Sequence, residues 1–286
     1  MAAAWSRVNT IVLLLVLFAL LALIGMVASG VRGGPLDPTN PPASTDSVRL
    51  PGTPISGQFT ISTPGHYYLT RDVRVTGAQN GITISASEVS VDLGGFRVDG
   101  NDTIGTYGII ITGSQTDITI ENGVVKDFHV GLHTNNGQRV RADGIQALSN
   151  VRGMEIGAVS VVSDCVSSSN AETGIYLSAL GSSTTITNCV VTANILDGIG
   201  IDGQLNVVKD SVVQGNGNID VYINQGSRTT VRDNTVDSVR IEVDSFLNYV
   251  FDNVCVQGGI TNAAGGGNYA PTFTATNIDP HYNAGC

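Results

Sequence analysis

The strongest constraint on this fold is a pattern that recurs about every 22 residues between Gly153 and Val243. Each repeat opens with two apolar residues around one variable position, and a polar turn then leads into a second β-rich run. After the second run comes a residue pair, Asp or Asn followed by Cys, Ser or Asn, and then a third short β run. The opening residues of successive repeats are Gly81, Gly108, Gly131, Gly153, Gly174, Gly198, Asp220 and Arg240. A period of this length with strand chemistry is typical of a β-solenoid.

Stacking explains why such repeats fold as one continuous column. Three short strands with one apolar face each cannot close a core alone. When coils stack about 4.8 Å apart, every strand forms parallel ladders with the coils above and below it. The residues expected to point inward from the first strand are Ile175 and Leu177, Ile199 and Ile201, Val221 and Ile223, and Ile241 and Val243. The residues expected to share one corner are Cys165, Cys189, Ser211, Asn234 and Asn253.

The pattern therefore predicts an all-β chain in which residues 49–258 form a single right-handed parallel β-helix of about nine coils. The uncharged apolar stretch 11–28 predicts an N-terminal hydrophobic helix within residues 1–30, which is either a cleaved signal peptide or a retained signal anchor. A Pro-rich linker follows over residues 31–48, and a Gly-rich cap or tail over residues 259–286.

Export follows from either interpretation of the leader. The folded part is then secreted, periplasmic or anchored on the extracytoplasmic side, and it meets the membrane only through residues 11–28, if these are not cleaved. Charged residues make up 13% of the chain, the formal net charge is −10 and there are only two lysines, Lys126 and Lys209. This composition argues against a nucleic-acid partner, because phosphate backbones are bound by Lys and Arg.

The opening coils resemble a known group of proteins. The segments Pro64-Gly-His-Tyr-Tyr-Leu69, Gly81-Ile-Thr-Ile84 and Val91-Asp-Leu-Gly-Gly-Phe96 are similar to the first coils of bacterial right-handed parallel β-helix repeat proteins in the pectin-lyase-like superfamily. The resemblance implies the fold but not the function, since the superfamily includes lyases, glycosidases, epimerases, adhesins and binding scaffolds.

The catalytic motifs of that superfamily are missing from the sequence. The Asn-Thr-Asp, Asp-Asp and Gly-His-Gly elements of polygalacturonases do not occur, nor does the Arg-x-Pro-x-x-Arg of pectate lyases. The alginate-epimerase-like Asp-Pro-His-Asp has only a near match, Asp279-Pro-His-Tyr282. Coils of 20–24 residues also leave short turns, whereas β-helix enzymes build groove walls from long insertions. The sequence favours a non-catalytic exported scaffold that binds carbohydrate or a cell surface.

The alternative function is a polysaccharide-active enzyme, a glycoside hydrolase or a lyase, that acts on an acidic or neutral glycan. In both cases the partner is a polysaccharide or a cell-surface glycan. No cofactor is expected. The four histidines (His66, His129, His133 and His281) are scattered, so they do not predict the clustered ligands that the superfamily's periplasmic copper-binding members would need.

Calcium is the one metal that the sequence suggests. Acidic or amide residues recur one position before the predicted corner, at Asp164, Asn188, Asp210, Asp233 and Asp252. A cation could bridge neighbouring carboxylates in such a column. Asp and Asn are also the residues that tolerate left-handed corners, and this turn interpretation is favoured.

The main candidate binding site is an outward column at the middle of the first strand. Its members are His133, Glu155, Tyr176, Gly200, Tyr222 and Glu242. Two tyrosine rings that flank a glycine notch, with charged groups at either end, suit the stacking of a sugar ring. The plainer interpretation is that tyrosines are common on solvent-facing strands.

A second candidate is a charged cluster in the longest coil and its neighbour. It comprises Asp99, Asp102, Lys126, Asp127, His129 and Arg141. Adjacent acids, an amine and an imidazole could carry out acid–base chemistry on a sugar. The same spacing also places Glu121 beside Arg141, which would be an ordinary ion pair between coils.

The four cysteines fit an oxidising compartment, and three pairings are open. Cys165 and Cys189 fall in the same corner column, which is compatible with a disulfide or with two stacked thiols. A bridge between Cys255 and Cys286 would fix the tail over the open end of the helix.

Overall fold

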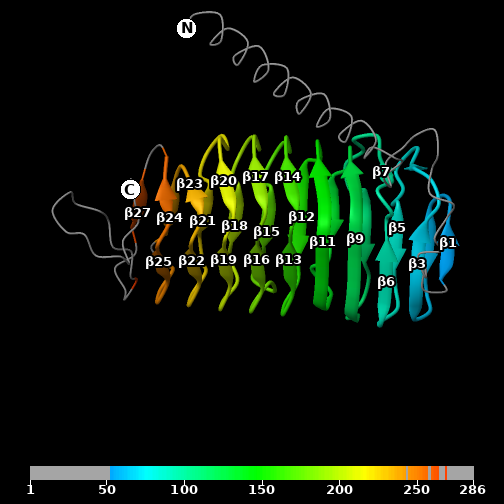
Figure 1. The fold of residues 1–286 in the computed structure, drawn as a ribbon, viewed down its shortest axis with the longest axis horizontal. Helices are drawn as coiled ribbons and strands as arrows, with labels where there is room; N and C mark the ends of the chain where they lie inside the picture. Colours follow the sequence, from blue (N-terminus) through cyan, green and yellow to red (C-terminus); the bar gives the residue numbers. More distant parts are fainter. Residues whose placement is uncertain (1–51, 243, 257–258, 264–267, 269–286) are drawn as a thin grey trace, which may run out of the picture. The chain divides into compact units, whose positions relative to one another are not determined.

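The computed structural model describes residues 52–242, 244–256, 259–263 and 268. These residues form an all-β solenoid of about nine coils, and all of their strand pairings are parallel (Figure 1). The predicted fold class is confirmed. Among the described residues no helix is long and apolar enough to cross a membrane, and the stretch 11–28 lies outside them.

Each coil contributes strands to three faces. The first face is a ten-stranded sheet. Its strands are β2 (Phe59–Ile61), β5 (Ile82–Ile84), β8 (Tyr107–Ile111), β10 (Val130–His133), β12 (Arg152–Ile156), β15 (Ile175–Leu177), β18 (Ile199–Ile201), β21 (Val221–Ile223), β24 (Val239–Ile241) and β27 (Ile260–Asn262). Since β27 pairs with β24, the solenoid continues past the expected boundary at residue 258.

The second and third faces together form a 17-stranded sheet, because β9 and β11 are long enough to run through both. The second face contains β1 (Thr53–Ile55), β3 (Gly65–Leu69), β6 (Val89–Asp92), β9 (Thr116–Lys126), β11 (Gln138–Leu148), β13 (Val161–Ser163), β16 (Thr185–Thr187), β19 (Val207–Lys209), β22 (Thr230–Arg232) and β25 (Tyr249–Phe251). The third contains β4 (Val73–Arg74), β7 (Arg97–Asp99), β14 (Val166–Ser168), β17 (Val190–Thr192), β20 (Val212–Gln214), β23 (Thr235–Val236) and β26 (Val254–Cys255), with the last parts of β9 and β11.

The core lies inside the coils, where apolar side chains stack in columns. The predicted inward pairs Ile175 and Leu177, Ile199 and Ile201, and Val221 and Ile223 are all fully buried and in register. The prediction for the next coil was wrong by two residues. Val239 lies opposite Val221 and Ile241 opposite Ile223, so the buried pair is Val239 and Ile241, and Val243 lies outside the described residues.

The predicted corner column is confirmed, and hydrogen bonds run along it. The amide of Ile145 donates to Cys165 Sγ, that of Cys189 to Ser211 Oγ, that of Ser211 to Asn234 Oδ1 and that of Asn234 to Asn253 Oδ1. Each of these acceptor side chains thus satisfies a buried backbone N–H at the bend of the coil before it. Without that acceptor, the N–H would be buried with no hydrogen-bond partner.

Cys165 and Cys189 are two buried thiols in this column, not a disulfide. Each is 1% exposed. The hydrogen bond with Cys189, together with burial, raises the pKa of the Cys165 thiol. The expected inward contact is therefore confirmed in its stacked-thiol form. Cys255 is buried as well, but Cys286 lies outside the described residues, so the bridge between them stays a prediction.

The residues one position before this corner adopt left-handed backbone conformations. Their φ angles lie between 52° and 57°, at Asp164, Asn188, Asp210, Asp233 and Asp252. Asp and Asn reach this region at less cost than other non-glycine residues, which agrees with the turn interpretation of the acidic column. The calcium alternative stays a prediction.

A second corner is lined by an asparagine ladder that the sequence analysis did not identify. Asn150, Asn170, Asn194 and Asn216 accept in turn from the amide of the residue one coil earlier. The ladder ends at Asp220, whose Oδ1 accepts from the Asn216 side chain at 2.8 Å and whose Oδ2 accepts from the amides of Asp237 and Ser238. Burial raises the pKa of Asp220, and these hydrogen bonds limit the shift.

A third corner ladder contains one mismatch. Thr184 donates its amide to Asn206 Oδ1, and Thr229 donates its amide to Asn248 Oδ1. Between them, the Asn206 Nδ2 and Thr229 Oγ1 atoms are buried and have no hydrogen-bond partner. Threonine at 229 is therefore the place where the ladder loses its continuity.

Replacing Thr229 with asparagine is expected to raise the free energy of unfolding by about 1 kcal/mol. The new side-chain amide would accept a hydrogen bond from the buried Asn206 Nδ2 atom and restore the ladder between neighbouring coils. Urea denaturation followed by circular dichroism measures the change. T230N is the matched control, since Thr230 is half-buried on the second face, outside the ladder. A T229N variant that is less stable than the wild type would show that the corner cannot accommodate the amide.

Candidate functional site

The central outward column of the first face is where the sequence predicted ligand binding. The strand register places His133 opposite Glu155, Glu155 opposite Tyr176, Tyr176 opposite Gly200, and Gly200 opposite Tyr222. Arg240, not Glu242, lies opposite Tyr222. Glu242 follows Ile241 and belongs to the neighbouring outward column, because the coil before it is two residues shorter than the sequence pattern suggested.

That neighbouring column is polar, and most of it was missed from the sequence. Its members each come one residue after a buried strand end: Ser178, Asp202, Asn224 and Glu242. Two of them contact each other across coils, since Asn224 Nδ2 donates to Asp202 Oδ1 at 3.2 Å. Their regular spacing of 18–24 residues, immediately after an apolar pair, was a signal in the sequence that could have found them.

Tyr176 is held by this second column. Its hydroxyl donates to Asp202 Oδ2 at 2.5 Å, and its ring lies against Gly200. A Cβ on Gly200 would be 3.2 Å from Tyr176 Cδ2, and Gly200 itself is buried. The glycine is therefore covered by the ring, and the open notch expected between the tyrosines is not present. Burial and the hydrogen bond to Asp202 raise the pKa of Tyr176 to about 12, so the hydroxyl keeps its proton and acts as a donor.

Tyr222, two coils after Tyr176, makes a similar set of contacts. Its hydroxyl lies 3.3 Å from Asn224 Oδ1 and 3.4 Å from Glu242 Oε1. Glu242 also forms an ion pair with Arg240 at 2.5 Å. Burial and the charge of Glu242 raise the pKa of Tyr222.

Each tyrosine carries a guanidinium beside its ring. The Arg152 Cζ atom lies 5.1 Å from the centre of the Tyr176 ring, and the Arg240 Cζ atom lies 5.9 Å from that of Tyr222. Such cation–π pairs hold the ring and the planar guanidinium together as one surface. The rings are thus paired rather than free, and a ligand would meet aromatic carbon and N–H donors side by side.

The N-terminal end of the column is a charge cluster around Glu155. His133 Nδ1 lies 2.5 Å from Glu155 Oε2, Arg152 pairs with both Glu155 and Glu172, and the Tyr107 ring lies 4.8 Å from the His133 ring. Burial alone would raise the pKa of Glu155, but the bond with His133 and the charge of Arg152 outweigh it, and the net pKa is lowered. Glu155 is therefore ionised and only 9% exposed, which suits it to fix Arg152 and His133 in place.

We call the combined surface the tyrosine strip. It comprises His133, Arg152, Glu155, Tyr176, Asp202, Tyr222, Asn224, Arg240 and Glu242. The sequence predicted the tyrosines, His133, Glu155 and Glu242, but not Arg152, Asp202, Asn224 or Arg240. Fixed rings, carboxylates, an amide and guanidiniums can together contact the apolar face and the hydroxyls of a sugar.

The second candidate cluster is only partly assembled. Asp99 lies opposite Lys126, and the Lys126 ammonium is 3.3 Å from Asp99 Oδ1 and 2.6 Å from Asp127 Oδ2. Asp102 donates its backbone N–H to the Asp127 carbonyl. The hydrogen bond to Asp127 outweighs burial and raises the pKa of Lys126, so the amine is charged and paired.

Three members of that cluster, Asp102, His129 and Arg141, do not take part in its ion pairs. Arg141 lies opposite Thr119 and pairs with Asp143, so its placement in the cluster was wrong, as was the expected pair with Glu121. The Nδ1 atom of His129 is buried and has no hydrogen-bond partner. The Asp99–Lys126–Asp127 group is consistent with an ion-pair network that joins neighbouring coils.

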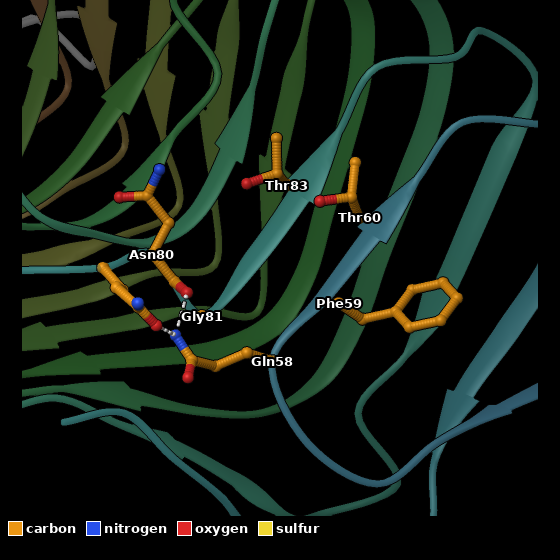
Figure 2. A pocket seen from close by; sticks show the side chains of 7 residues that line it. Gln58, Phe59, Thr60, Asn80, Gly81 and Thr83 are labelled. Carbon is orange, nitrogen blue, oxygen red and sulfur yellow. Dashed lines mark hydrogen bonds between the residues drawn. The ribbon is translucent and has the colours of Figure 1, made fainter.

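A pocket of about 350 Å³ opens at the N-terminal end of the first face, between β2 and β5 (Figure 2). It is lined by Gln58, Phe59, Thr60, Gln79, Asn80, Gly81 and Thr83. Thr60 lies opposite Thr83, Thr83 opposite Ile110, and Ile110 opposite His133. Both threonines therefore belong to the same outward column as the tyrosines. The sequence analysis did not identify this pocket.

Comparisons with known proteins identify a family and several similar folds. The model of the family described as Periplasmic copper-binding protein (NosD) matches residues 64–269. No curated protein matches the chain. Solved structures match at low identity. The Dettilon tailspike protein gp208 has a TM-score of 0.53 at 14% identity over 74% of this chain, and the chain spans 61% of the tailspike.

Two enzymes give similar results. The mannuronan C-5 epimerase AlgE4 A-module of Azotobacter vinelandii has a TM-score of 0.51 at 13% identity, with 82% of this chain and 88% of that chain covered. Pectate lyase Pel9A has a TM-score of 0.55 at 14% identity, with 80% and 72% covered. Likeness at this identity shows the fold alone, and it confirms the predicted right-handed parallel β-helix.

The copper named in the family description requires a suitable set of ligands. Copper favours imidazole, thiolate and thioether groups gathered around one point. Within the described ranges, no group of three or more His, Cys, Asp or Glu side chains could hold a metal ion. His133 is bound to Glu155, and Cys165 and Cys189 lie inside a corner of the core. The described residues do not fit a copper centre.

Proposed function

Because the chain belongs to the family described as Periplasmic copper-binding protein (NosD), we propose that it acts outside the cytoplasm as a non-catalytic β-helix scaffold that binds carbohydrate on its tyrosine strip. Residues 11–28 would either direct its export or hold it at the membrane. Copper has no part in this proposal. The observation that carries it is the pair of tyrosines fixed by hydrogen bonds across coils, each beside a guanidinium.

Rigidity supports a binding role for these side chains. The Tyr176 hydroxyl is tied to Asp202 and the Tyr222 hydroxyl to Asn224 and Glu242, so the rings lose little freedom when a ligand arrives. Aromatic rings offer a large contact area, and the neighbouring carboxylates can accept hydrogen bonds from sugar hydroxyls.

The same contacts argue for binding rather than catalysis. A general acid in a glycosidase needs a carboxyl whose pKa is raised so that it holds a proton. In the strip the pKa of Glu155 is lowered, and Tyr176 keeps its proton because its pKa is raised to about 12. Glu155 and Tyr176 therefore hold neighbouring side chains in place, and they give no support to the enzyme alternative.

Replacing both Tyr176 and Tyr222 with alanine is expected to weaken glycan binding about 100-fold, at roughly tenfold for each ring. A panel of neutral and acidic oligosaccharides identifies the ligand, and calorimetry measures its affinity. The full-length chain should be kept in a detergent without a sugar headgroup, so that the detergent does not compete.

The matched control is Tyr249→Ala, because Tyr249 is exposed on the second face and lies outside the strip. Its affinity should equal that of the wild type. Circular dichroism checks that the double variant keeps its β structure. A folded double variant with wild-type affinity would place the glycan site elsewhere and end the proposal.

A further inference from the structure

We propose that the pocket between β2 and β5 is a separate subsite that binds one uncharged sugar unit. This inference does not require the tyrosine strip to bind anything, since its contacts come from other residues. The lining holds amide and hydroxyl side chains, and none of its seven residues is charged. A volume of about 350 Å³ is at the small end of the range for ligand pockets and suits one ring rather than a chain.

The amides of the pocket are fixed in position by hydrogen bonds. Gln58 Nε2 donates to Gln79 Oε1 at 2.9 Å and to the Asn80 carbonyl at 3.0 Å (Figure 2). Asn80 Oδ1 accepts from the Tyr107 amide at 3.0 Å. Each of these bonds uses one end of an amide group. The other ends, Gln58 Oε1, Gln79 Nε2 and Asn80 Nδ2, make no hydrogen bond to any residue that the structure describes.

Two hydroxyls complete the pocket. Thr60 and Thr83 lie opposite each other on β2 and β5, about one ladder spacing apart, and their side chains point the same way in Figure 2. Neither hydroxyl forms a hydrogen bond within the described part of the chain. Phe59 lies opposite the buried Ile82, so its ring points away from these hydroxyls and lies 6.1 Å from the ring of the core residue Tyr67.

This combination matches the chemistry of a neutral sugar. Several preplaced donors and acceptors can pair with the hydroxyls of one sugar ring. A uronate would bring a carboxylate into a pocket whose lining offers no cation to pair with it, and leaving that charge unpaired would cost affinity. The pocket should therefore prefer neutral hexose units to uronates.

The position of the pocket adds a geometric expectation. Thr83 and Tyr176 are in one outward column and four coils apart, which is about 19 Å at the ladder spacing. A glycan that lies along the column could occupy both places, and a ligand that spans two sites gains affinity from the second contact. The pocket would then bind the terminal unit of the glycan.

The test titrates the full-length chain with gluco-, manno- and galacto-oligosaccharides, and with galacturonate oligosaccharides as the charged comparison. We expect Gln58→Ala, which removes the amide that links Gln79 and Asn80, to weaken binding of the preferred neutral sugar about tenfold, and Thr83→Val about threefold. Valine keeps the β-branched shape of Thr83 and removes only the hydroxyl.

The controls remove the same groups at other places. Gln204→Ala removes an exposed amide that is not part of the pocket, and Thr185→Val removes a hydroxyl from the outer side of the second face. Both should bind like the wild type. If no neutral sugar binds, or if folded Q58A and T83V variants bind like the wild type, the pocket is not a sugar site.

The double tyrosine variant separates this inference from the proposed function. Binding lost in Q58A but retained after Tyr176 and Tyr222 are both replaced by alanine would support the pocket and contradict the strip. Binding lost only in the double variant would overturn the pocket and leave the strip. Losses in both, with affinity that rises as the oligosaccharide lengthens, would support one ligand that occupies both sites.

Discussion

Replacing Phe128 with alanine is expected to lower the free energy of unfolding by about 3–5 kcal/mol. Phe128 is the largest of the fully buried side chains, with 0% exposure. Its ring lies between two glycines of neighbouring backbone: a Cβ on Gly100 would be 2.9 Å from Phe128 Cδ1, and a Cβ on Gly108 would be 3.0 Å from Phe128 Cδ2. Because stacked strands cannot close around the space, alanine would leave a cavity.

Urea denaturation followed by circular dichroism measures the loss. Phe246→Ala is the matched control, because Phe246 is 48% exposed and its removal should change stability by less than about 0.5 kcal/mol. If F128A is as stable as F246A, the ring cannot be packed in the core as described, or the coil around it collapses to fill the space.

The sequence predicted the core well because burial repeats along the chain. An apolar residue on either side of one variable position marks the first-face strand in coil after coil, and the pairs at Ile175 and Ile199 are buried as expected. The pattern failed at one coil for a physical reason. The run Val239-Arg-Ile-Glu-Val243 alternates three times, so two registers satisfy it equally, and only the partner strand decides between them.

The candidate site was less predictable because it depends on contacts between columns. The register gave the neighbours of Tyr176 along its own column, but its hydroxyl bonds to Asp202, which lies on the next coil in a different column. The pairing of Arg152 with the Tyr176 ring likewise depends on side-chain conformations that a repeat does not encode. The asparagine ladder was different. Asn150, Asn170, Asn194 and Asn216 recur with the same period, so the signal was present in the sequence.

Replacing Asn194 with alanine is expected to lower the free energy of unfolding by about 3 kcal/mol, because it breaks that ladder in the middle. Asn194 Oδ1 accepts from the Asn170 amide at 3.1 Å and from Asn170 Nδ2 at 2.8 Å. Its Nδ2 donates to the Ser167 carbonyl at 3.1 Å and to Asn216 Oδ1 at 2.9 Å. Asn194 is 2% exposed, so water cannot easily replace these partners.

Asn218→Ala is the matched control for this loss. Asn218 is an exposed asparagine one coil later that makes one side-chain bond, to Asp197, and its removal should change stability by less than about 0.5 kcal/mol. Equal stability of N194A and N218A in urea would contradict the role of the ladder.

Aspartate at position 194 tests the direction of the ladder's hydrogen bonds. In N194D the Oδ1 acceptor is kept, but the second oxygen would face the Ser167 carbonyl and Asn216 Oδ1, which are both acceptors. The buried carboxyl should therefore have a raised pKa, so the folded state binds its proton more tightly than the unfolded state does. The stability deficit relative to the wild type should grow as pH rises through that pKa and shrink as pH falls below it. A deficit that does not change with pH would mean that the side chain at 194 reaches water, and that the ladder is not closed.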